Sequence, residues 1–414
     1  MMNREVTTDN FNKKPLWVNF INSTWKRSYF LGTKIELEKD HLIKLARKQS
    51  GLHSFGEDFW EEPLERLISS INEEADLHPI GRFITQKRLT SLLTIRLRAE
   101  HWFRKHPEIL EQELYPVYLI CGLQRTGTTK LQRLLSADPD NRVLLSWEVL
   151  NPVPLSENPD EINQRIAAAK LSEKALKLMA PGFFSIHPVE FEKPEEDILL
   201  LDTTFMSTTP EATMNVPSYA SWLEQTDQSN AYAYGAKLLK FLQWQRPGKR
   251  WILKTPHHME FLDLVKKHYG KVHYIWTHRD INESLPSFMS MVAHSQTIFS
   301  DNVSLHRVAQ HWLRKTIYML STGIEFRKNN PNQKFTDVYY KDFIAAPMDV
   351  IEELYRSIGK ISPELHQKFL DAEKINAPNR FGKHRYSLEN FNLNKEDVGK
   401  QLKFYTDYLK TIQK

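Results

Sequence analysis

The stretch GLQRTGTT, Gly122–Thr129, constrains this chain most, because it joins an apolar run to a helical pattern through two glycines. The run Tyr115–Cys121 has the length of a buried strand, and Thr128–Ser136 has the spacing of a helix. Glycines let the backbone approach an anion closely, and the N–H groups of the turn and of the helix N-terminus then point at it. The stretch therefore predicts a phosphate-binding loop after a buried strand.

The side chains of this loop suggest what kind of phosphate it holds. Arg125 offers a fork for two anionic oxygens, and the threonines add hydroxyl donors. A nucleotide triphosphatase would have a lysine where Thr128 stands, and a magnesium-binding Asp at the end of another strand. The sequence has no convincing strand that ends in a magnesium-binding Asp. We therefore expect the loop to bind a phosphate that is not part of a triphosphate, and we expect no required metal. An ordinary glycine turn is the alternative. The expected binding residues are Gly122, Arg125, Thr126, Gly127, Thr128 and Thr129.

Three later apolar runs are each followed by a helical pattern. Repeated strand, loop and helix predict an α/β fold, a P-loop-like parallel sheet flanked by helices, in which ligands gather at the carboxyl ends of the strands. The expected strands are 250–253, 271–277 and 335–340, and the helices after them are 258–269, 281–293 and 348–357.

The remaining patterns divide the chain into regions. Residues 1–114 predict a helical N-terminal region packed on the core, with helices at 61–75 and 80–104. Residues 115–414 are expected to form the α/β domain. The stretch 145–249 separates the first two strands and is too long for a simple crossover. It has helical patterns at 161–179 and 230–244, and we expect it to cap the site and contact an acceptor.

The composition limits the kinds of molecule that the chain is expected to bind. With 414 residues and 41% hydrophobic residues, the chain can bury a large core. The net charge of +5 is mild, and without a dense basic patch it favours a small anion over nucleic acid. The single cysteine, Cys121, ends an apolar run and is expected to be a buried packing thiol. We expect no intrachain disulfide, no secretory signal and no membrane span. We also expect a cytoplasmic location, and a homo-oligomer is compatible with the sequence.

A second candidate anion site follows the strand at 271–277. In THRDINESLPS, Arg279 stands at the carboxyl end of the strand and Ser287 follows eight residues later, about two helical turns along. Both can hold a phosphate if the chain between them folds back. A pair between Arg279 and Asp280, with Ser287 as a surface hydroxyl, is equally compatible.

Taken together, these motifs resemble the sulfotransferases that use 3′-phosphoadenosine 5′-phosphosulfate (PAPS). The resemblance is closest to a broad branch with many bacterial members and runs from about Pro116 to the C-terminus. It implies that the first loop holds the 5′-phosphosulfate and that Arg279 and Ser287 hold the 3′-phosphate. Lys130 stands where many relatives have an aromatic residue that stacks on adenine. Further matching segments are SWEVLNPVP, PEEDILLL, YGAKLLKFLQWQ, WILKTPHHMEFLD, IWTHRD, DVYYKDF and GKHRYSLENF.

The resemblance also suggests the chemistry. Lys254 is expected against the bridging or sulfate oxygens, and an imidazole is a suitable base for the acceptor hydroxyl near neutral pH. The family pattern K-x-P-x-H favours His258, while neighbouring His257 remains open. Glu148 is a further candidate base, although a role in orienting Lys254 or a histidine is favoured for it.

The late segment GKHRY resembles a basic loop that covers the nucleotide, so Lys383 and Arg385 are expected near the 3′-phosphate; a solvated basic turn fits as well. The acceptor is expected to be a small, lipophilic hydroxyl compound, because the capping stretch is rich in aromatic residues. The expected products are the desulfated nucleotide PAP and a sulfate ester. A P-loop kinase or nucleotide triphosphatase is the alternative, and a nucleotide-binding partner module without catalysis is the third. The aromatic residues are Phe183, Phe184, Phe191, Phe205, Tyr219 and Trp222.

Overall fold

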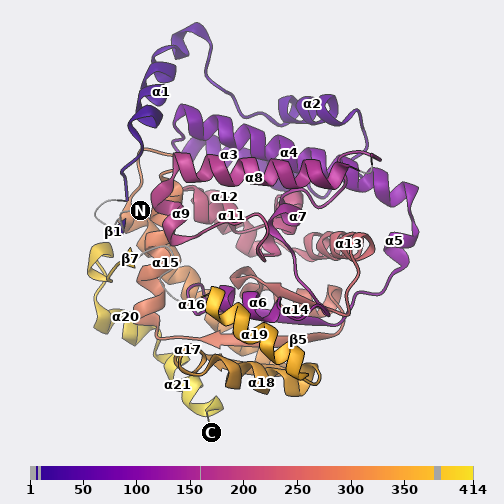
Figure 1. Ribbon diagram of the computed structural model, residues 1–414. Helices are drawn as coiled ribbons and strands as arrows, with labels where there is room; N and C mark the ends of the chain where they lie inside the picture. Colours follow the sequence, from indigo (N-terminus) through magenta and orange to yellow (C-terminus); the bar gives the residue numbers. More distant parts are fainter. Residues whose placement is uncertain (1–5, 8–10, 159, 377–383, 414) are drawn as a thin grey trace.

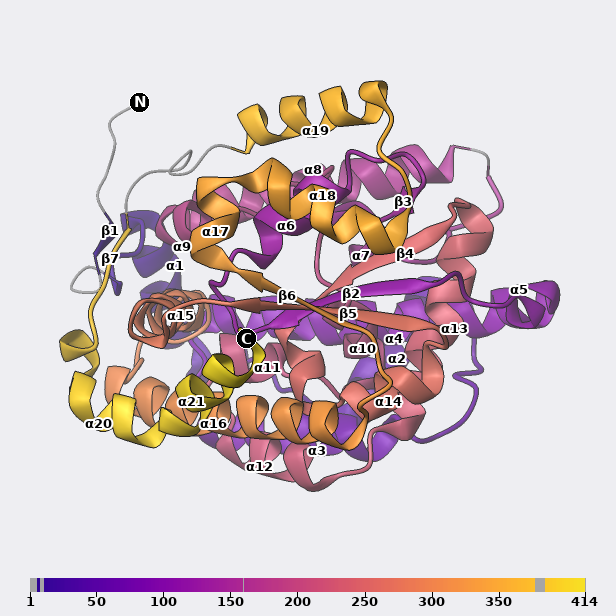
Figure 2. The same cartoon turned by 90° about the horizontal axis from the view of Figure 1, so that it is seen from below.

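The computed structural model describes residues 6–7, 11–158, 160–376 and 384–413. Its centre is a five-stranded parallel sheet in the order β3-β4-β2-β5-β6 (Figure 2). The short strands β1 (Val6–Thr7) and β7 (His384–Arg385) pair separately. The five strands of the main sheet are β2 (Val117–Gly122), β3 (Asn141–Arg142), β4 (Arg250–Lys254), β5 (Val272–His278) and β6 (Phe335–Tyr339).

The sheet confirms the predicted α/β class and all four predicted strands. Strand β3 was not predicted, because it has only two residues and neither is apolar. The centre of the sheet is β2, in which Ile120 stands opposite both Lys254 of β4 and Ile275 of β5. The carboxyl ends of these three strands therefore lie side by side.

Successive residues of β2 face opposite sides of the sheet, as expected for a strand buried on both faces. Leu119 and Cys121 pack in the large core on one side, and Ile120 packs in the core on the other. Cys121 is fully buried, as predicted, and desolvation raises the pKa of its thiol far above its usual range.

Helices cover both faces of the sheet (Figure 2). On one face, α6 (Thr128–Leu135), α18 (Pro347–Ile358) and α19 (Pro363–Ile375) share a core with the strands. On the other face, the core includes α13 (Ser229–Gln245), α14 (Leu262–His268) and α16 (Leu305–Asn329). Most predicted helices are present within a few residues. None of the helices in the described ranges is long and apolar enough to cross a bilayer.

One predicted helix is divided. The pattern at 258–269 forms a 3₁₀ turn, η4 (Pro256–Glu260), and then the short helix α14. Between them Phe261 has φ −138° and ψ 34°, which is not a helical conformation. This break sets the directions of the two adjacent histidines.

The N-terminal helices pack against the insertion (Figure 1). Apolar residues of α3 (Glu61–Glu74) and α4 (Pro79–Lys105) form a second core with Phe205, Met206 and Tyr219 of the insertion. The other N-terminal elements are α1 (Leu16–Arg27), η2 (Tyr29–Leu31), α2 (Lys39–Ser50) and α5 (Glu108–Glu111).

Short elements complete the insertion and the C-terminal part. In the insertion these are α7 (Ser146–Leu150), α8 (Glu161–Met179), α9 (Pro181–Ile186), α10 (Ile198–Leu201), η3 (Asp202–Thr204), α11 (Thr209–Thr213) and α12 (Pro217–Gln225). The later elements are α15 (Ile281–Gln296), α17 (Tyr340–Ala345), η5 (Glu389–Phe391), α20 (Lys395–Gln401) and α21 (Lys403–Ile412).

Candidate active site

The predicted phosphate loop connects the carboxyl end of β2 to the N-terminus of α6. Gly122, Arg125 and Gly127 have φ of 120°, 65° and 93°, in the region that favours glycine. A Cβ on Gly122 would lie 2.5 Å from the Thr277 carbonyl oxygen, so only glycine fits beside β5. A side chain at Gly127 would approach the Tyr340 ring. The glycines are therefore required by close packing as well as by the turn.

Thr126 holds the loop closed. Its hydroxyl donates to the Leu123 carbonyl oxygen at 2.6 Å and lies 2.6 Å from the Thr277 hydroxyl, and the side chain is buried. Both contacts are made within the protein, so the expected contact of this hydroxyl with an anion stays a prediction.

The two predicted anion sites meet in space. Arg125 Nε donates to Ser287 Oγ at 3.1 Å, and Arg279 donates from one guanidinium nitrogen to the Arg125 carbonyl oxygen at 2.9 Å. The Arg279 guanidinium also stacks on Tyr340, 4.2 Å from the ring centroid, and pairs with Glu283 at 2.8 Å. The chain from 281 to 296 is one helix rather than a fold-back, and Arg279 and Ser287 are brought together through their contacts with Arg125.

Arg125 is an uncompensated cation within the described residues. Burial lowers the pKa of the Arg125 guanidinium, and the positive charge of nearby Arg279 lowers it further. It forms no ion pair in the part of the chain that the structure describes. An anion placed here would offset the cost of burying this charge.

Lys254 ends β4 and is tied to the acidic segment 194–197. Its ammonium lies 2.6 Å from Glu196, whose other oxygen accepts from the Thr255 hydroxyl at 2.9 Å. Asp197 accepts from the Lys254 backbone N–H at 3.0 Å. Asp197 stands at the N-terminus of α10 but forms no side-chain cap of it. The two acids position Lys254 and the turn that follows it.

His258 belongs to a buried network. Its Nε2 lies 2.6 Å from Asp197 and its Nδ1 lies 2.8 Å from the Tyr232 hydroxyl, and the side chain has no exposed area. Both ring nitrogens are thus occupied by the protein. These contacts disfavour His258 as the base, and its assignment as the base stays a prediction.

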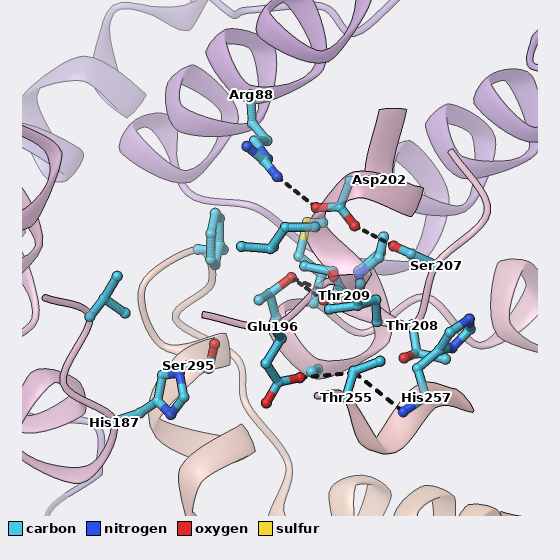
Figure 3. A pocket seen from close by; sticks show the side chains of 18 of the residues that line it. Arg88, His187, Glu196, Asp202, Ser207, Thr208, Thr209, Thr255, His257 and Ser295 are labelled. Carbon is cyan, nitrogen blue, oxygen red and sulfur yellow. Dashed lines mark hydrogen bonds and ion pairs between the residues drawn. The ribbon is translucent and has the colours of Figure 1, made fainter. Parts of the chain in front are cut away.

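His257 is the histidine that lines the cavity beside this segment (Figure 3). Neither ring nitrogen has a hydrogen-bond partner among the described residues. Desolvation, together with His258 and Lys315, lowers the pKa of His257 well below its ordinary value, so the ring is neutral near pH 7. The unused nitrogens leave the ring free to accept a hydrogen bond from a hydroxyl, while the same desolvation makes it a weaker base.

Glu148 lies in a different cluster. Both of its oxygens receive hydrogen bonds from Arg142, at 2.8 and 2.9 Å, and from Arg246, at 2.9 and 3.2 Å. Burial raises the pKa of the Glu148 carboxyl, but the two arginines outweigh burial and hold it below its ordinary value. Glu148 thus joins β3 to the end of α13, while Lys254 is held by Glu196 instead. A role of Glu148 as a base stays a prediction.

The cavity has a volume of about 460 Å³ and is mostly apolar. It begins beside the phosphate loop and the 255–257 turn, and residues of α3 and α4 form part of its wall. The N-terminal region therefore contributes to the site, which the sequence assigned to the insertion alone. Of the six predicted aromatic residues, three line the cavity: Phe183, Phe205 and Tyr219.

Two polar features of the cavity were missed. His187, after α9, lines it together with Glu196, and burial is the main cause that lowers the pKa of the imidazole. Arg88 of α4 pairs with Asp202 at 2.6 Å (Figure 3). Figure 3 shows this pair on one side of the cavity and His257 on the other. No local motif marks these residues in the sequence.

The remaining predicted residues are placed as follows. Lys383 lies outside the described residues, and Arg385 is described only by its backbone in β7, which pairs with Thr7 of β1. Lys130 pairs with Glu373 at 2.7 Å. Within the described ranges, no group of three His, Cys, Asp or Glu residues is arranged to hold a metal ion.

Comparison with known proteins identifies the family. The sulfotransferase family model matches residues 116–361. The structure is similar to that of sulfotransferase STF1 from Mycobacterium tuberculosis H37Rv, with a TM-score of 0.78 and 27% identity over 89% of this chain and 99% of that one. It shares the fold of STF9 from Mycobacterium avium, with a TM-score of 0.80 and 24% identity over 90% and 97%. None of the curated proteins matches the sequence significantly. The chain therefore belongs to the sulfotransferase family.

Proposed function

We propose that this sulfotransferase takes its sulfuryl group from PAPS and transfers it to a hydroxyl of a small lipophilic molecule. The observation that carries the proposal is the contact between the two predicted anion sites, made by Arg125 with Ser287 and by Arg279 with the loop backbone. Together they form a cationic surface at the carboxyl edge of the sheet. An apolar cavity opens beside it.

The donor fits this surface by charge. In the family pattern, the loop Gly122–Thr129 receives the 5′-phosphosulfate, and Arg279 and Ser287 receive the 3′-phosphate. Arg125 belongs to the loop and also contacts Ser287 and Arg279, and it has no carboxylate partner among the described residues. An anionic nucleotide would supply the missing counter-charge. No lysine stands at Thr128 to reach a triphosphate, which disfavours the kinase or triphosphatase alternative.

Transfer requires a cation at the leaving group and a base at the acceptor. Lys254 is held by Glu196 at the end of β4, next to the strand that carries the loop. We assign it to the charge that develops on the leaving phosphate. His257 accepts the proton of the acceptor hydroxyl. The acceptor oxygen forms a bond to sulfur, the bond from sulfur to the phosphate oxygen breaks, and PAP leaves with that electron pair.

The cavity supports a lipophilic acceptor. Its walls are mainly aliphatic and aromatic side chains from α3, α4 and the insertion. Polar side chains such as Arg88 with Asp202 are present among these walls and would orient the molecule. Most of the cavity surface is apolar, which favours a lipophilic acceptor over a sugar.

Two measurements test the proposal. Calorimetry should detect binding of PAP to the purified protein, and ATP with magnesium should bind far more weakly. Incubation with PAPS and a panel of sterols, phenols, aliphatic alcohols and sugars should yield sulfate esters, detected by mass spectrometry, from the apolar compounds. Absence of PAP binding would overturn the donor assignment. PAP binding without product from any acceptor would instead indicate a nucleotide-binding module without catalysis.

A further inference from the structure

Exposed apolar side chains gather at the N-terminal end of the described chain. Of the thirteen large hydrophobic residues that are exposed in the described ranges, six lie within α1 and η2. Phe83 of α4 adds a seventh, with its ring 6.3 Å from that of Trp25. Such a concentration is unusual for a surface facing water. We call it the N-terminal patch: Leu16, Trp17, Phe20, Ile21, Phe30, Leu31 and Phe83.

The helix α1 holds this patch outward. Leu16 is 87% exposed and Phe20 is 72% exposed, whereas Val18 and Asn22 on another face of the helix are buried. Asn22 accepts a hydrogen bond from the Ile80 backbone N–H at 3.0 Å, which fixes the helix to the start of α4. The anchored face thus includes a polar residue, and none of the described residues covers the apolar face. Figure 1 shows α1 at the rim of the molecule.

The charge of this segment differs from that of the rest of the chain. Residues 11–35 contain five lysine and arginine residues and no acidic residue. The chain has 56 basic and 51 acidic residues, so outside this segment the two kinds are equal at 51 each. The formal net charge of +5 therefore belongs to this segment. Lys13, Lys26 and Arg27 in it are exposed.

From this combination we propose that the N-terminal patch docks the enzyme onto a membrane surface containing anionic lipids. Apolar side chains enter the boundary between headgroups and acyl chains, and the surrounding cations meet the lipid phosphates. Trp17 and Trp25 supply the indoles that favour this boundary. Of the five cations, Lys14 pairs with Asp301 and Lys34 pairs with Glu36. A second copy of the chain is a poorer occupant, because a symmetric contact would bring the exposed Lys13, Lys26 and Arg27 against their own copies. The docking does not depend on the identity of the donor or acceptor.

The patch adjoins the wall of the cavity. Phe83 belongs to the patch, and the next residue of α4, Ile84, lines the cavity. A bilayer docked on the patch would lie beside the helix that helps to enclose the apolar site. This placement suits an enzyme whose acceptor dissolves in lipid.

Vesicle sedimentation tests the proposal with the full chain and no substrate. The protein should pellet with vesicles of phosphatidylcholine mixed with phosphatidylglycerol, bind much less to phosphatidylcholine alone, and dissociate as salt is raised. The double substitution Leu16→Glu and Phe30→Glu should weaken binding at least about tenfold. The matched control is Leu171→Glu with Leu178→Glu on α8, which makes the same kind of change at two exposed residues outside the patch and should bind as the parent does.

The contrary outcomes are distinct. Absence of binding to the anionic vesicles, or equal binding by the parent and the Leu16→Glu, Phe30→Glu variant, would overturn the proposal. Light scattering that finds a dimer in the parent and a monomer in this variant would assign the patch to a second copy instead. Thermal unfolding of each variant checks that weaker vesicle binding is not caused by unfolding. All four substituted side chains are exposed, so we expect each variant to fold.

Discussion

Arg125 donates a hydrogen bond to Ser287 across 162 positions of the chain, at 3.1 Å. This bond joins the loop after β2 to the helix after β5, which are adjacent strands of the sheet. The parallel pairing of these strands brings their carboxyl ends to one edge, so two sites far apart in the chain become one surface. The candidate nucleotide site is a consequence of this strand order.

Arg279→Ala is expected to weaken PAP binding by roughly tenfold or more, because a charge-assisted hydrogen bond to a phosphate is lost. Calorimetry with PAP measures the effect. The matched control is Glu283→Gln, which removes the surface partner of Arg279 and leaves the arginine in place. Unchanged PAP affinity in Arg279→Ala would contradict the second anion site.

His257→Asn and His258→Asn should have different effects. His257→Asn is expected to lower kcat by about 10²-fold. It breaks no side-chain hydrogen bond among the described residues, so its cost in stability comes only from the lost packing of the ring against Phe261. His258→Asn should instead destabilise the fold by about 2 kcal/mol, because it disrupts buried hydrogen bonds to Asp197 and Tyr232. Urea unfolding and steady-state kinetics on both variants check this. Full turnover in His257→Asn would remove it as the base.

Glu148→Gln is expected to destabilise the protein by about 3 kcal/mol, because two arginines would lose their carboxylate partner in a buried site. The activity per folded molecule should be nearly unchanged. The control Glu157→Gln breaks an exposed pair with Lys105 and should change stability by less than about 1 kcal/mol. A folded but inactive Glu148→Gln would restore this residue as a candidate in catalysis.

The pH dependence of the free energy of unfolding should reveal the raised pKa of Glu260. This buried carboxyl lies 2.9 Å from Lys315, which also contacts Glu224 and Glu211. Desolvation is the largest cause that raises the pKa of Glu260, to about 8. Between about pH 4.5 and about pH 8 the folded protein keeps this proton and the unfolded chain releases it, so this group makes stability fall as pH rises.

Urea unfolding of the parent and of Glu260→Gln across this range isolates the contribution. The variant should lose less stability than the parent between about pH 5 and about pH 8, because it has no proton to release. A difference between the two proteins that does not change with pH would contradict the raised pKa.

Local patterns predicted those parts of the fold and the site that depend on neighbouring residues. The glycines of Gly122–Thr129 mark the turn, because a left-handed backbone requires them, and apolar runs mark the strands, because each lies buried between helices. The family pattern adds Lys254, Arg279 and Ser287 to the residues that the sequence predicts for the site. These residues share short segments with the glycine and strand signals that locate them.

Tertiary structure decided which of the similar groups faces the cavity. His257 and His258 are adjacent and chemically equal in the sequence; the 3₁₀ turn at Pro256–Glu260 and the contacts of Asp197 and Tyr232 distinguish them. Glu148 was a further candidate in the sequence, and the structure places Arg246, 98 positions away, against it. Such outcomes depend on partners distant in the chain, and no periodicity or spacing records which distant residues meet. The sequence by itself therefore determined the sheet, the glycine turn after β2 and the family, while packing between remote segments decided which side chains line the cavity.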